Sequence, residues 1–352
     1  MSWLSDIARP EIRALQAYAH ASWEPGLIRL HANESPWRAD EDPSEAGLNR
    51  YPEPHPQALM QRLAQFYGVP PGCALAGRGS DEAIDLLIRS FCRAGQDAII
   101  TTPPTFGMYS VAAHIQGAQV ITVPLQRAAH YRLDMAALRA ALTPTVRLVF
   151  LCSPNNPTGN LLADREAVLD LARALEGRAL LVVDEAYVEF SDQPSLAAEI
   201  ERLPALVVLR TLSKAHGLAG ARCGTLLAQS EVVQLLGKVI QPYAVTQLTI
   251  EAVFRALAPA ALARTQQRIA LLIAERARLA TGLARLPGVE RVWPSAANFL
   301  LVECADPAGA LQRCHDAGLL VRDFSSARGL QRALRITVGA PEQNDQLLAS
   351  LA

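Results

Sequence analysis

Hydrophobic residues in the first two thirds of the chain form short continuous runs rather than alternating positions. Such runs are typical of strands covered on both faces, as in a parallel sheet. Segments with the helical spacing of apolar residues separate them. The runs occupy residues 98–101, 119–123, 147–151, 179–183 and 205–209, and the helical segments occupy 80–93, 105–116, 135–142 and 164–175. This alternation predicts an α/β fold with a mostly parallel, doubly wound sheet.

The pattern changes after about residue 241. One long helical stretch at 245–286 is interrupted at Pro259, and short strand-like runs then alternate with helices at 289–292, 299–302, 319–321 and 334–338. We therefore predict an N-terminal arm at 1–44 that packs with the small domain, a large domain at 45–244 and a small α+β domain at 245–352. A cleft between two domains is a common place for a ligand.

Composition and charge exclude several classes of protein. Half of the residues are hydrophobic, but the apolar runs are shorter than a membrane span requires. Residues 1–13 contain charged side chains and no apolar signal core, so we expect a cytoplasmic protein. The net charge of −1 and the scattered arginines argue against a nucleic-acid surface. The six cysteines lack Cys-x-x-Cys spacing, which favours buried reduced thiols over a metal site.

Lysine is scarce in this chain. Only Lys214 and Lys238 occur among the 33 basic residues, and the rest are arginines. Arginine replaces lysine as a surface charge but not as a nucleophile, because guanidinium keeps its proton whereas a desolvated ammonium loses one. Lys214 is therefore a candidate Schiff-base lysine. The alternative is that Lys214 was retained by chance. The presence of Lys238 shows that retention of a lysine is by itself weak evidence for a catalytic role.

Polar residues follow three of the predicted strands. Asp184 ends the run at 179–183, Asn156 lies in the proline-rich turn after 147–151, and Ser213 precedes Lys214 after 205–209. In α/β sheets the carboxyl ends of the strands line the ligand crevice. The structural alternative is that these residues only cap helices or solvate turns.

Two further features suit a phosphate group. Residues 77–82 read Gly-Arg-Gly-Ser-Asp-Glu before a predicted helix, whose first-turn amides are able to hold an anion. The alternative is an ordinary helix start with Ser80 as the cap. Arg222 follows Lys214 by eight residues, and its planar guanidinium suits a phosphate shared with Ser213.

Together these features match the needs of pyridoxal phosphate. This cofactor requires a lysine for its aldehyde, a carboxylate for its ring nitrogen and anchors for its phosphate. An asparagine or tyrosine near the ring hydroxyl tunes the imine proton. Each role has a candidate residue at a strand end of the same predicted sheet.

Several motifs resemble fold-type I, aspartate-aminotransferase-like pyridoxal-phosphate enzymes, namely Asn155-Asn156-Pro157-Thr158-Gly159, Asp184-Glu185-Ala186-Tyr187, and Ser213-Lys214 through Arg222. Other segments are similar to the histidinol-phosphate aminotransferase branch of these enzymes: residues 30–36, 50–54, 210–214, 297–299, 321–324 and 334–339. The match is collinear over nearly the whole chain. It implies a fold-type I transferase with a large cofactor-binding domain and a smaller α+β domain.

The resemblance implies cofactor-binding roles for individual residues. Lys214 forms the Schiff base and later moves the proton between the substrate Cα and the cofactor. Asp184 pairs with the ring nitrogen, and Asn156 and Tyr187 contact the ring hydroxyl. Tyr109 stacks on the ring. The phosphate is held by Ser80, Asp81, Ser213 and Arg222.

The resemblance also implies contacts with a second subunit and with the substrate. Tyr51 reaches the phosphate of the other subunit's cofactor, so a homodimer is expected. Arg335, assisted by Arg322, binds the carboxylate or phosphate of the substrate, and Tyr18 closes over that anion. Asn33 and Asn298 help to define the pocket.

One position departs from the family pattern close to the lysine. His216 stands where the family usually has phenylalanine, and we interpret it as tolerance of another flat ring, with altered protonation of the site as the alternative. A second departure, Ser35 in place of the asparagine of many relatives, affects only a loop contact.

The expected function is an aminotransferase of histidine biosynthesis. It would move an amino group between L-histidinol phosphate and 2-oxoglutarate, giving imidazole-acetol phosphate and L-glutamate by a ping-pong mechanism. An aromatic or broad-specificity aminotransferase and a threonine-phosphate decarboxylase are the alternatives, because no motif shows which Cα bond stands perpendicular to the ring. A regulatory module is disfavoured, since the sequence has no basic helix-turn-helix pattern.

Overall fold

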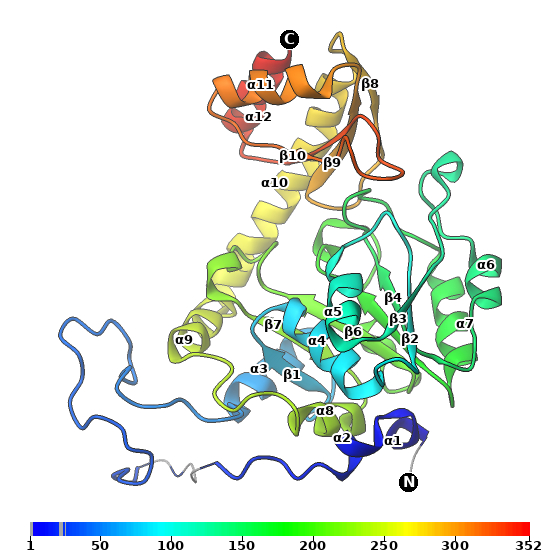
Figure 1. Ribbon diagram of the computed structural model, residues 1–352. Helices are drawn as coiled ribbons and strands as arrows, with labels where there is room; N and C mark the ends of the chain where they lie inside the picture. Colours follow the sequence, from blue (N-terminus) through cyan, green and yellow to red (C-terminus); the bar gives the residue numbers. More distant parts are fainter. Residues whose placement is uncertain (1–2, 21–23, 25) are drawn as a thin grey trace.

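The centre of the molecule is a seven-stranded sheet with the strand order β1-β7-β6-β5-β4-β2-β3. The computed structural model, shown in Figure 1, describes residues 3–20, 24 and 26–352. The strands are β1 (Ala74–Gly77), β2 (Ala98–Thr101), β3 (Gln119–Thr122), β4 (Val146–Cys152), β5 (Leu180–Asp184), β6 (Leu206–Thr211) and β7 (Gly224–Leu227). The neighbours from β3 to β6 pair in parallel, whereas β7 is antiparallel to both β6 and β1. The predicted mostly parallel α/β sheet is confirmed.

Helices cover both faces of this sheet, which explains the continuous hydrophobic runs. Val149 and Leu151 of β4 pack in one buried cluster with residues of α6 and α7. Leu148 and Phe150 pack in a second cluster with α4, α5 and α8, because successive residues of a strand point to opposite faces. The helices are α3 (Gln57–Tyr67), α4 (Ser80–Phe91), α5 (Met108–Gln116), α6 (Met135–Ala140), α7 (Arg165–Leu175) and α8 (Ser230–Gly237), with short 3-10 turns η1 (Arg127–Ala129), η2 (Val188–Phe190), η3 (Leu196–Glu199) and η4 (Ala219–Ala221).

The C-terminal part forms a second, antiparallel sheet with the order β10-β11-β9-β8. Its elements are α9 (Gln247–Ala256), α10 (Pro259–Leu283), β8 (Val289–Val292), β9 (Phe299–Cys304), α11 (Pro307–Asp316), β10 (Arg322–Asp323), β11 (Ala333–Thr337) and α12 (Pro341–Leu351). The long helical stretch is divided where we expected, because Pro259 suits the first turn of a new helix. The strand expected at 319–321 is not formed, since pairing with β11 begins only at Arg322 opposite Arg335.

The arm departs from the expected packing. Its two short helices, α1 (Trp3–Ile7) and α2 (Pro10–Ala14), bury Leu4, Ile7 and Ile12 in the same cluster as α4 and α8 of the large domain. The expectation that the arm packs with the small domain is therefore wrong for these helices, because their apolar side chains cover the outer face of the large domain. The chain after α2 runs away from the body (Figure 1). The boundaries at 45 and 245 remain predictions.

The two sheets are joined by specific contacts at the carboxyl ends of the large sheet. The Ala296 amide donates to the carbonyl of Gly159 at 2.7 Å, and the guanidinium of Arg276 in α10 donates to the carbonyl of Phe190 at 3.0 Å. These bonds hold the small domain over the strand ends. In the described part of the chain no helix is both long and apolar enough to cross a membrane.

Candidate active site

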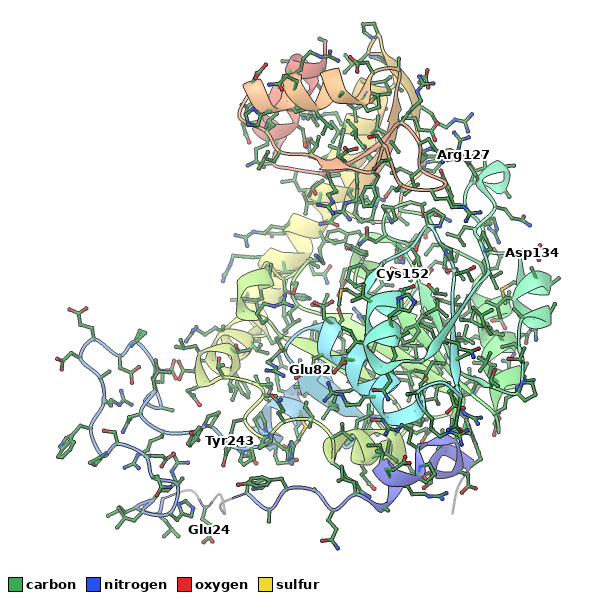
Figure 2. The ribbon with its side chains drawn as sticks, viewed as in Figure 1. Glu24, Glu82, Arg127, Asp134, Cys152 and Tyr243 are labelled. Carbon is green, nitrogen blue, oxygen red and sulfur yellow. The ribbon has the colours of Figure 1, made fainter. Side chains whose placement is uncertain are left out.

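A cavity of about 260 Å³ opens at the carboxyl ends of β4, β5 and β6, which end at Cys152, Asp184 and Thr211. Figure 2 places Cys152 between the large sheet and the small domain. The cavity is lined by Gly79, Ser80, Asp81, Phe106, Cys152, Asn156, Asp184, Ala186, Tyr187, Thr211, Ser213, Lys214, Ala219, Arg222 and Arg335. Most of the residues predicted from the sequence therefore meet in one place, although they come from distant segments.

One end of the cavity is built to hold an anion. Helix α4 starts after Gly79, whose φ is +92°, and among the described residues no side chain caps its first-turn amides. Ser80 is thus the first residue of the helix and not its cap. The positive end of the helix dipole and the Arg222 guanidinium, which donates to Asp81 at 3.2 Å, face the same space.

Two glycines make this anion pocket possible. A Cβ atom on Gly224 of β7 would stand 2.2 Å from the carbonyl carbon of Gly79 and 2.4 Å from the amide nitrogen of Ser80. A Cβ atom on Gly79 would stand 2.7 Å from Nη2 of Arg222. Only glycine permits so close an approach of β7 and Arg222 to the start of α4.

Asp184 is a buried carboxylate that also lines the cavity. Its Oδ2 accepts a hydrogen bond from the Tyr109 hydroxyl at 2.8 Å, and its Oδ1 accepts one from the Ala186 amide at 3.2 Å. Burial raises the pKa of Asp184 to about 6, although these two hydrogen bonds lower it. A cationic nitrogen placed against this group would favour the charged form. Asp184 is therefore suited to a protonated ring nitrogen.

Lys214 lies in the loop after β6 and lines the cavity. Burial lowers the pKa of its amine, and the positive charges of Arg335 and Arg222 lower that pKa further. Its Nζ stands 5.7 Å from the ring centroid of Tyr187. An amine that loses its proton more easily is a better nucleophile and a better base, so the environment fits the predicted role.

Asn156 connects the two domains across the cavity. Its side-chain amide donates to the Tyr187 hydroxyl at 3.3 Å, and its carbonyl oxygen accepts a hydrogen bond from the guanidinium of Arg335 on β11. The Arg335 guanidinium lies over the rings of Phe299 and Phe324, at 5.4 and 5.5 Å from their centroids. The small domain thus supplies a fixed cation beside the lysine.

The predicted position of Tyr109 is wrong. Tyr109 is fully buried, it stacks on Phe150 with 4.8 Å between the ring centroids, and it does not line the cavity. Phe106 lines the cavity instead. Tyr109 lies in the first turn of α5 and points into the core, whereas Phe106 precedes the helix and remains in the loop above the strand ends. Phe106 is thus placed to cover a planar ring, and Tyr109 supports Asp184 from behind.

Several other predicted residues lie outside this cavity. Tyr18 is 72% exposed on the arm, and Asn33 and Tyr51 line a separate cavity beside α9. Arg322 pairs with Arg335 across β10 and β11 but stays exposed, and Asn298 is also absent from the lining. Within one chain these residues do not meet Lys214.

The residues that line the cavity fit pyridoxal phosphate. The donors at the α4 end match a phosphate, the buried carboxylate of Asp184 matches a pyridine nitrogen, and Lys214 matches an aldehyde. Phe106 provides a flat apolar wall. The tight approach at Gly79 and Gly224 brings Arg222 and β7 against the start of α4, where backbone amides are able to hold an anion.

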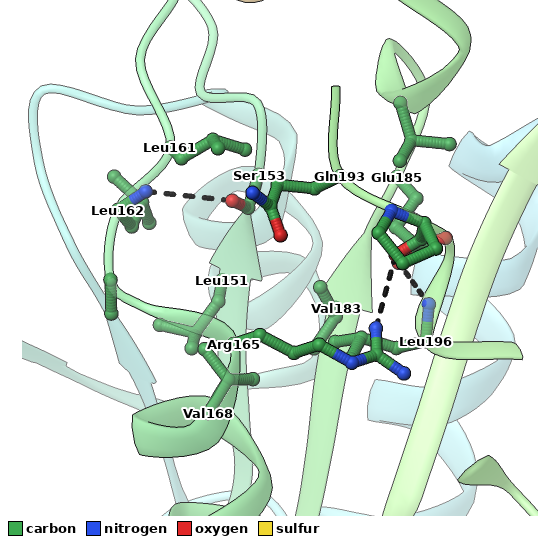
Figure 3. Close-up of a pocket in the computed structure, with 13 residues that line it drawn as sticks. Leu151, Ser153, Leu161, Leu162, Arg165, Val168, Val183, Glu185, Gln193 and Leu196 are labelled. Carbon is green, nitrogen blue, oxygen red and sulfur yellow. Dashed lines mark hydrogen bonds between the residues drawn. The ribbon is translucent and has the colours of Figure 1, made fainter. Parts of the chain in front are cut away.

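Another, much smaller cavity lies beside the ends of β4 and β5 (Figure 3). It has a volume of about 50 Å³ and mostly apolar walls. Its two charged side chains are engaged, because Glu185 accepts from the Leu196 amide at 2.7 Å and Arg165 donates to the Pro194 carbonyl at 3.1 Å. This cavity has neither the size nor the available polar groups of the first.

Comparison with known proteins identifies the family. The model of the family described as aminotransferase class I and II matches residues 34–351. The chain belongs to this family. Across 352 aligned residues, the aminotransferase is 47% identical to the histidinol-phosphate aminotransferase of Stenotrophomonas maltophilia, covering 98% of this chain and 96% of the relative. It is 48% identical over 350 residues to the enzyme of that name from Xylella fastidiosa, covering 98% and 95% of the two chains.

Solved structures support the same fold and cofactor. The aminotransferase resembles the histidinol-phosphate aminotransferase of Sinorhizobium meliloti in complex with pyridoxal-5'-phosphate, with a TM-score of 0.78, 28% identity and coverage of 86% and 82% of the two chains. It also resembles L-threonine-O-3-phosphate decarboxylase from Porphyromonas gingivalis, with a TM-score of 0.73, 27% identity and coverage of 86% and 90%. The prediction of a pyridoxal-phosphate-dependent aminotransferase of fold type I is confirmed.

Sequence reasoning missed several residues of the aminotransferase cavity, namely Gly79, Phe106, Cys152, Ala186, Thr211 and Ala219. For Cys152 and Thr211 a signal was present, since each is the last residue of a strand that ends at the crevice. Phe106 stands in the loop before a helix, where only the three-dimensional path of the chain shows which aromatic side chain faces the cavity.

Proposed function

We propose that this aminotransferase moves the amino group of L-histidinol phosphate to 2-oxoglutarate, in histidine biosynthesis, with ping-pong kinetics. The observation that carries the proposal is the identity of 47% over nearly the whole chain to relatives named histidinol-phosphate aminotransferase. The cationic groups of the cavity agree with it. Both amino donors, histidinol phosphate and glutamate, are anionic, and so are their keto products.

The residues of the cavity have distinct proposed roles toward the cofactor. Bound pyridoxal phosphate supplies an electron-withdrawing ring that stabilises negative charge at the substrate Cα. Asp184 holds a proton on the ring nitrogen by opposing it with a buried negative charge. Asn156 and Tyr187 orient the ring through its hydroxyl, and Phe106 excludes water from one face of the ring.

Lys214 is the proposed acid and base of the reaction. Its lowered amine pKa allows Nζ to take the proton from the substrate Cα and to deliver it to the cofactor. The anchors at Ser80, Ser213 and Arg222 hold the phosphate, so that the reacting atoms stay in reach of this one amine.

Arg335 is the proposed anion receptor for both substrates. It is half-buried against two aromatic rings and is held by Asn156, so its guanidinium is oriented before the substrate arrives. Arg322 lies beside it in register and adds positive charge at the entrance. A planar guanidinium accepts either a carboxylate or a phosphate, which lets two different substrates share one pocket. We also propose that Asn298, which directly precedes β9, contributes to this pocket although it does not line the cavity within one chain.

The proposal includes a homodimer in which the arm completes the partner's site. The side chains of the arm include Ile28, Leu30 and Trp37, which are 87, 90 and 79% exposed. Contact with a second copy of the chain would remove this apolar surface from water. Tyr51 and Tyr18 would reach the cofactor phosphate and the substrate anion after this assembly, and Asn33 would line the same entrance.

A donor panel tests the proposed substrate. L-Histidinol phosphate, L-phenylalanine and L-threonine phosphate are each offered with 2-oxoglutarate, and both glutamate and carbon dioxide are measured. The proposal expects glutamate formation with the highest kcat/KM for histidinol phosphate. Release of carbon dioxide from threonine phosphate without glutamate would instead establish the decarboxylase, and a preference for phenylalanine would establish the aromatic aminotransferase.

A further inference from the structure

The ring of Tyr51 is stacked on the ring of Tyr243 within the same chain. Their centroids are 4.6 Å apart and the ring planes differ by 28°. Both residues line a cavity of about 470 Å³ formed between the arm and α9, separate from the cavity that contains Lys214. Figure 2 shows Tyr243 on the side of the molecule from which the arm extends. Tyr51 is 51% exposed, so the stack leaves one face of its ring open.

The backbone of Tyr51 is fixed as firmly as its ring. Its amide donates to Oε1 of Glu34 at 2.7 Å, and Glu34 forms ion pairs with Arg29 and Arg50, each at 3.0 Å. The Glu34 side chain is only 2% exposed. Burying a carboxylate between two guanidinium groups costs desolvation free energy. We take this cost in a surface loop as a sign that the residue held by the carboxylate requires a defined position.

Tyr243 itself has an unusual backbone. Its φ is +63°, the left-handed region that a bulky side chain rarely adopts. The Tyr243 amide donates to the carbonyl of Pro54 at 3.3 Å, which ties this turn to the segment that carries Tyr51. Residues held in such conformations cluster where the local geometry serves function. The turn follows α8, and the left-handed residue directs the Tyr243 ring toward Tyr51.

We infer that Tyr243 is a positioning residue for the phosphate group of the partner's cofactor, acting through Tyr51. Without the stack, a half-exposed tyrosine would sample several rotamers and would lose that freedom on binding. With the stack, the Tyr51 hydroxyl is presented in one direction to the neighbouring subunit. The inference rests on the proposed function, because it requires a dimer in which Tyr51 meets the partner's phosphate.

The first test measures cofactor affinity rather than turnover. Tyr243→Ala removes the stack, whereas Tyr243→Phe retains it. The dissociation constant of pyridoxal phosphate from the cofactor-free dimer should rise about three- to tenfold in Tyr243→Ala, and it should change less than twofold in Tyr243→Phe. The effect should vanish when Tyr51 is already Phe, since the hydroxyl that is positioned is then missing. An equal loss in both Tyr51 backgrounds overturns the inference.

Mixed dimers show which subunit is affected. In each mixed dimer, one chain carries Lys214→Ala and the other chain keeps Lys214. Only the site of the chain that keeps Lys214 gives the imine absorbance. Tyr243→Ala on the Lys214→Ala chain should weaken cofactor binding at that intact site, whereas the same change on the chain with Lys214 should not. The reverse pattern, or no difference, contradicts a role across the interface.

Two further measurements serve as controls, one for folding of the variant and one for the proposed reaction. Circular dichroism and sedimentation establish whether Tyr243→Ala still forms a folded dimer, and if it does not, the Tyr243→Leu variant replaces it in both tests. If the wild-type enzyme transfers no amino group from any donor, the proposed function fails, but the cofactor-affinity comparison still decides the role of Tyr243.

Discussion

The hydroxyl of Tyr109 donates a 2.8 Å hydrogen bond to Oδ2 of Asp184, and both side chains are buried. Asp184 faces the cavity, whereas Tyr109 lies behind it in the core. Tyr109, which does not line the cavity, thus influences the charge of Asp184, which does. Asp184 resists ionisation because of its burial, and Tyr109 opposes that effect by stabilising the carboxylate.

Replacing Asp184 by Asn should stabilise the cofactor-free protein. The folded pKa of about 6 lies above the ordinary value of 3.8, so the folded state holds this proton more tightly than the unfolded state does. The resulting cost to stability is absent below pH 3.8 and fully present above about pH 6. Urea unfolding at about pH 7.5 should therefore show a gain of about 1–3 kcal/mol for Asp184→Asn.

The same substitution should remove nearly all transaminase activity of the loaded enzyme, because the ring nitrogen loses its charge partner. The gain in stability should also shrink as the pH falls toward 4. Near-normal turnover, or a cofactor-free variant that unfolds more easily at neutral pH, contradicts the assigned role and protonation of Asp184.

Removing the Tyr109 hydroxyl should move the pH dependence of cofactor binding. In Tyr109→Phe the carboxylate loses a stabilising donor, so the pKa of Asp184 rises further above its ordinary value. At a given mildly acidic pH a larger fraction of Asp184 is then protonated. Titration of the cofactor-free enzyme with pyridoxal phosphate should show affinity falling at a higher pH than in the wild type. Phe106→Ala is the comparison, since it should weaken binding without moving this pH.

The two lysines allow a clear test of the Schiff base. Reduction of the loaded enzyme with borohydride should attach the cofactor to Lys214 and leave Lys238 unmodified, as read by peptide mapping. Lys214→Ala should abolish the imine absorbance and turnover. Lys238→Ala is the matched control, because Lys238 lies at the end of α8 and its amine donates to the carbonyl of Arg13. Transamination by Lys214→Ala would rule out the mechanism.

Arg335→Ala should impair both half-reactions. Loss of a charged hydrogen-bond donor costs about 1.5–3 kcal/mol, so the apparent KM for histidinol phosphate and for 2-oxoglutarate should each rise roughly ten- to hundredfold. Arg322→Ala should have a smaller effect, since its side chain is exposed. A large change for only one of the two substrates would show that they do not share an anion site.

Gly224→Ala should damage the phosphate pocket specifically. Its Cβ would stand 2.2 Å from the backbone of Gly79, so β7 must move away from the start of α4. We expect a loss of about 1–3 kcal/mol in stability together with weaker cofactor binding. Gly237→Ala is the control, because a Cβ there would have no described heavy atom within 4 Å. Wild-type affinity in Gly224→Ala would show that this contact is dispensable.

The strands at the centre of the large sheet were predictable because helices cover both of their faces. Residues 148–151 and 179–183 lie in central strands whose two faces are both covered, so every position in these two runs is apolar. β1 and β7 gave no comparable signal. Each is four residues long and contains a glycine, and their pairing joins residues about 150 positions apart.

The sequence by itself predicted that Asp184 and Lys214 meet at one crevice, because they follow recognisable strands and a parallel sheet brings such strand ends together, and it predicted Arg222 from its spacing of eight residues after Lys214. Only the tertiary structure decided that Phe106 and not Tyr109 faces the cavity, that the arm helices pack on the large domain, and that Tyr51 stacks on Tyr243. The reason is physical. The positions of the central strands follow from the local hydrophobic pattern, whereas the direction of a loop side chain depends on contacts between segments distant in sequence, which no local pattern records.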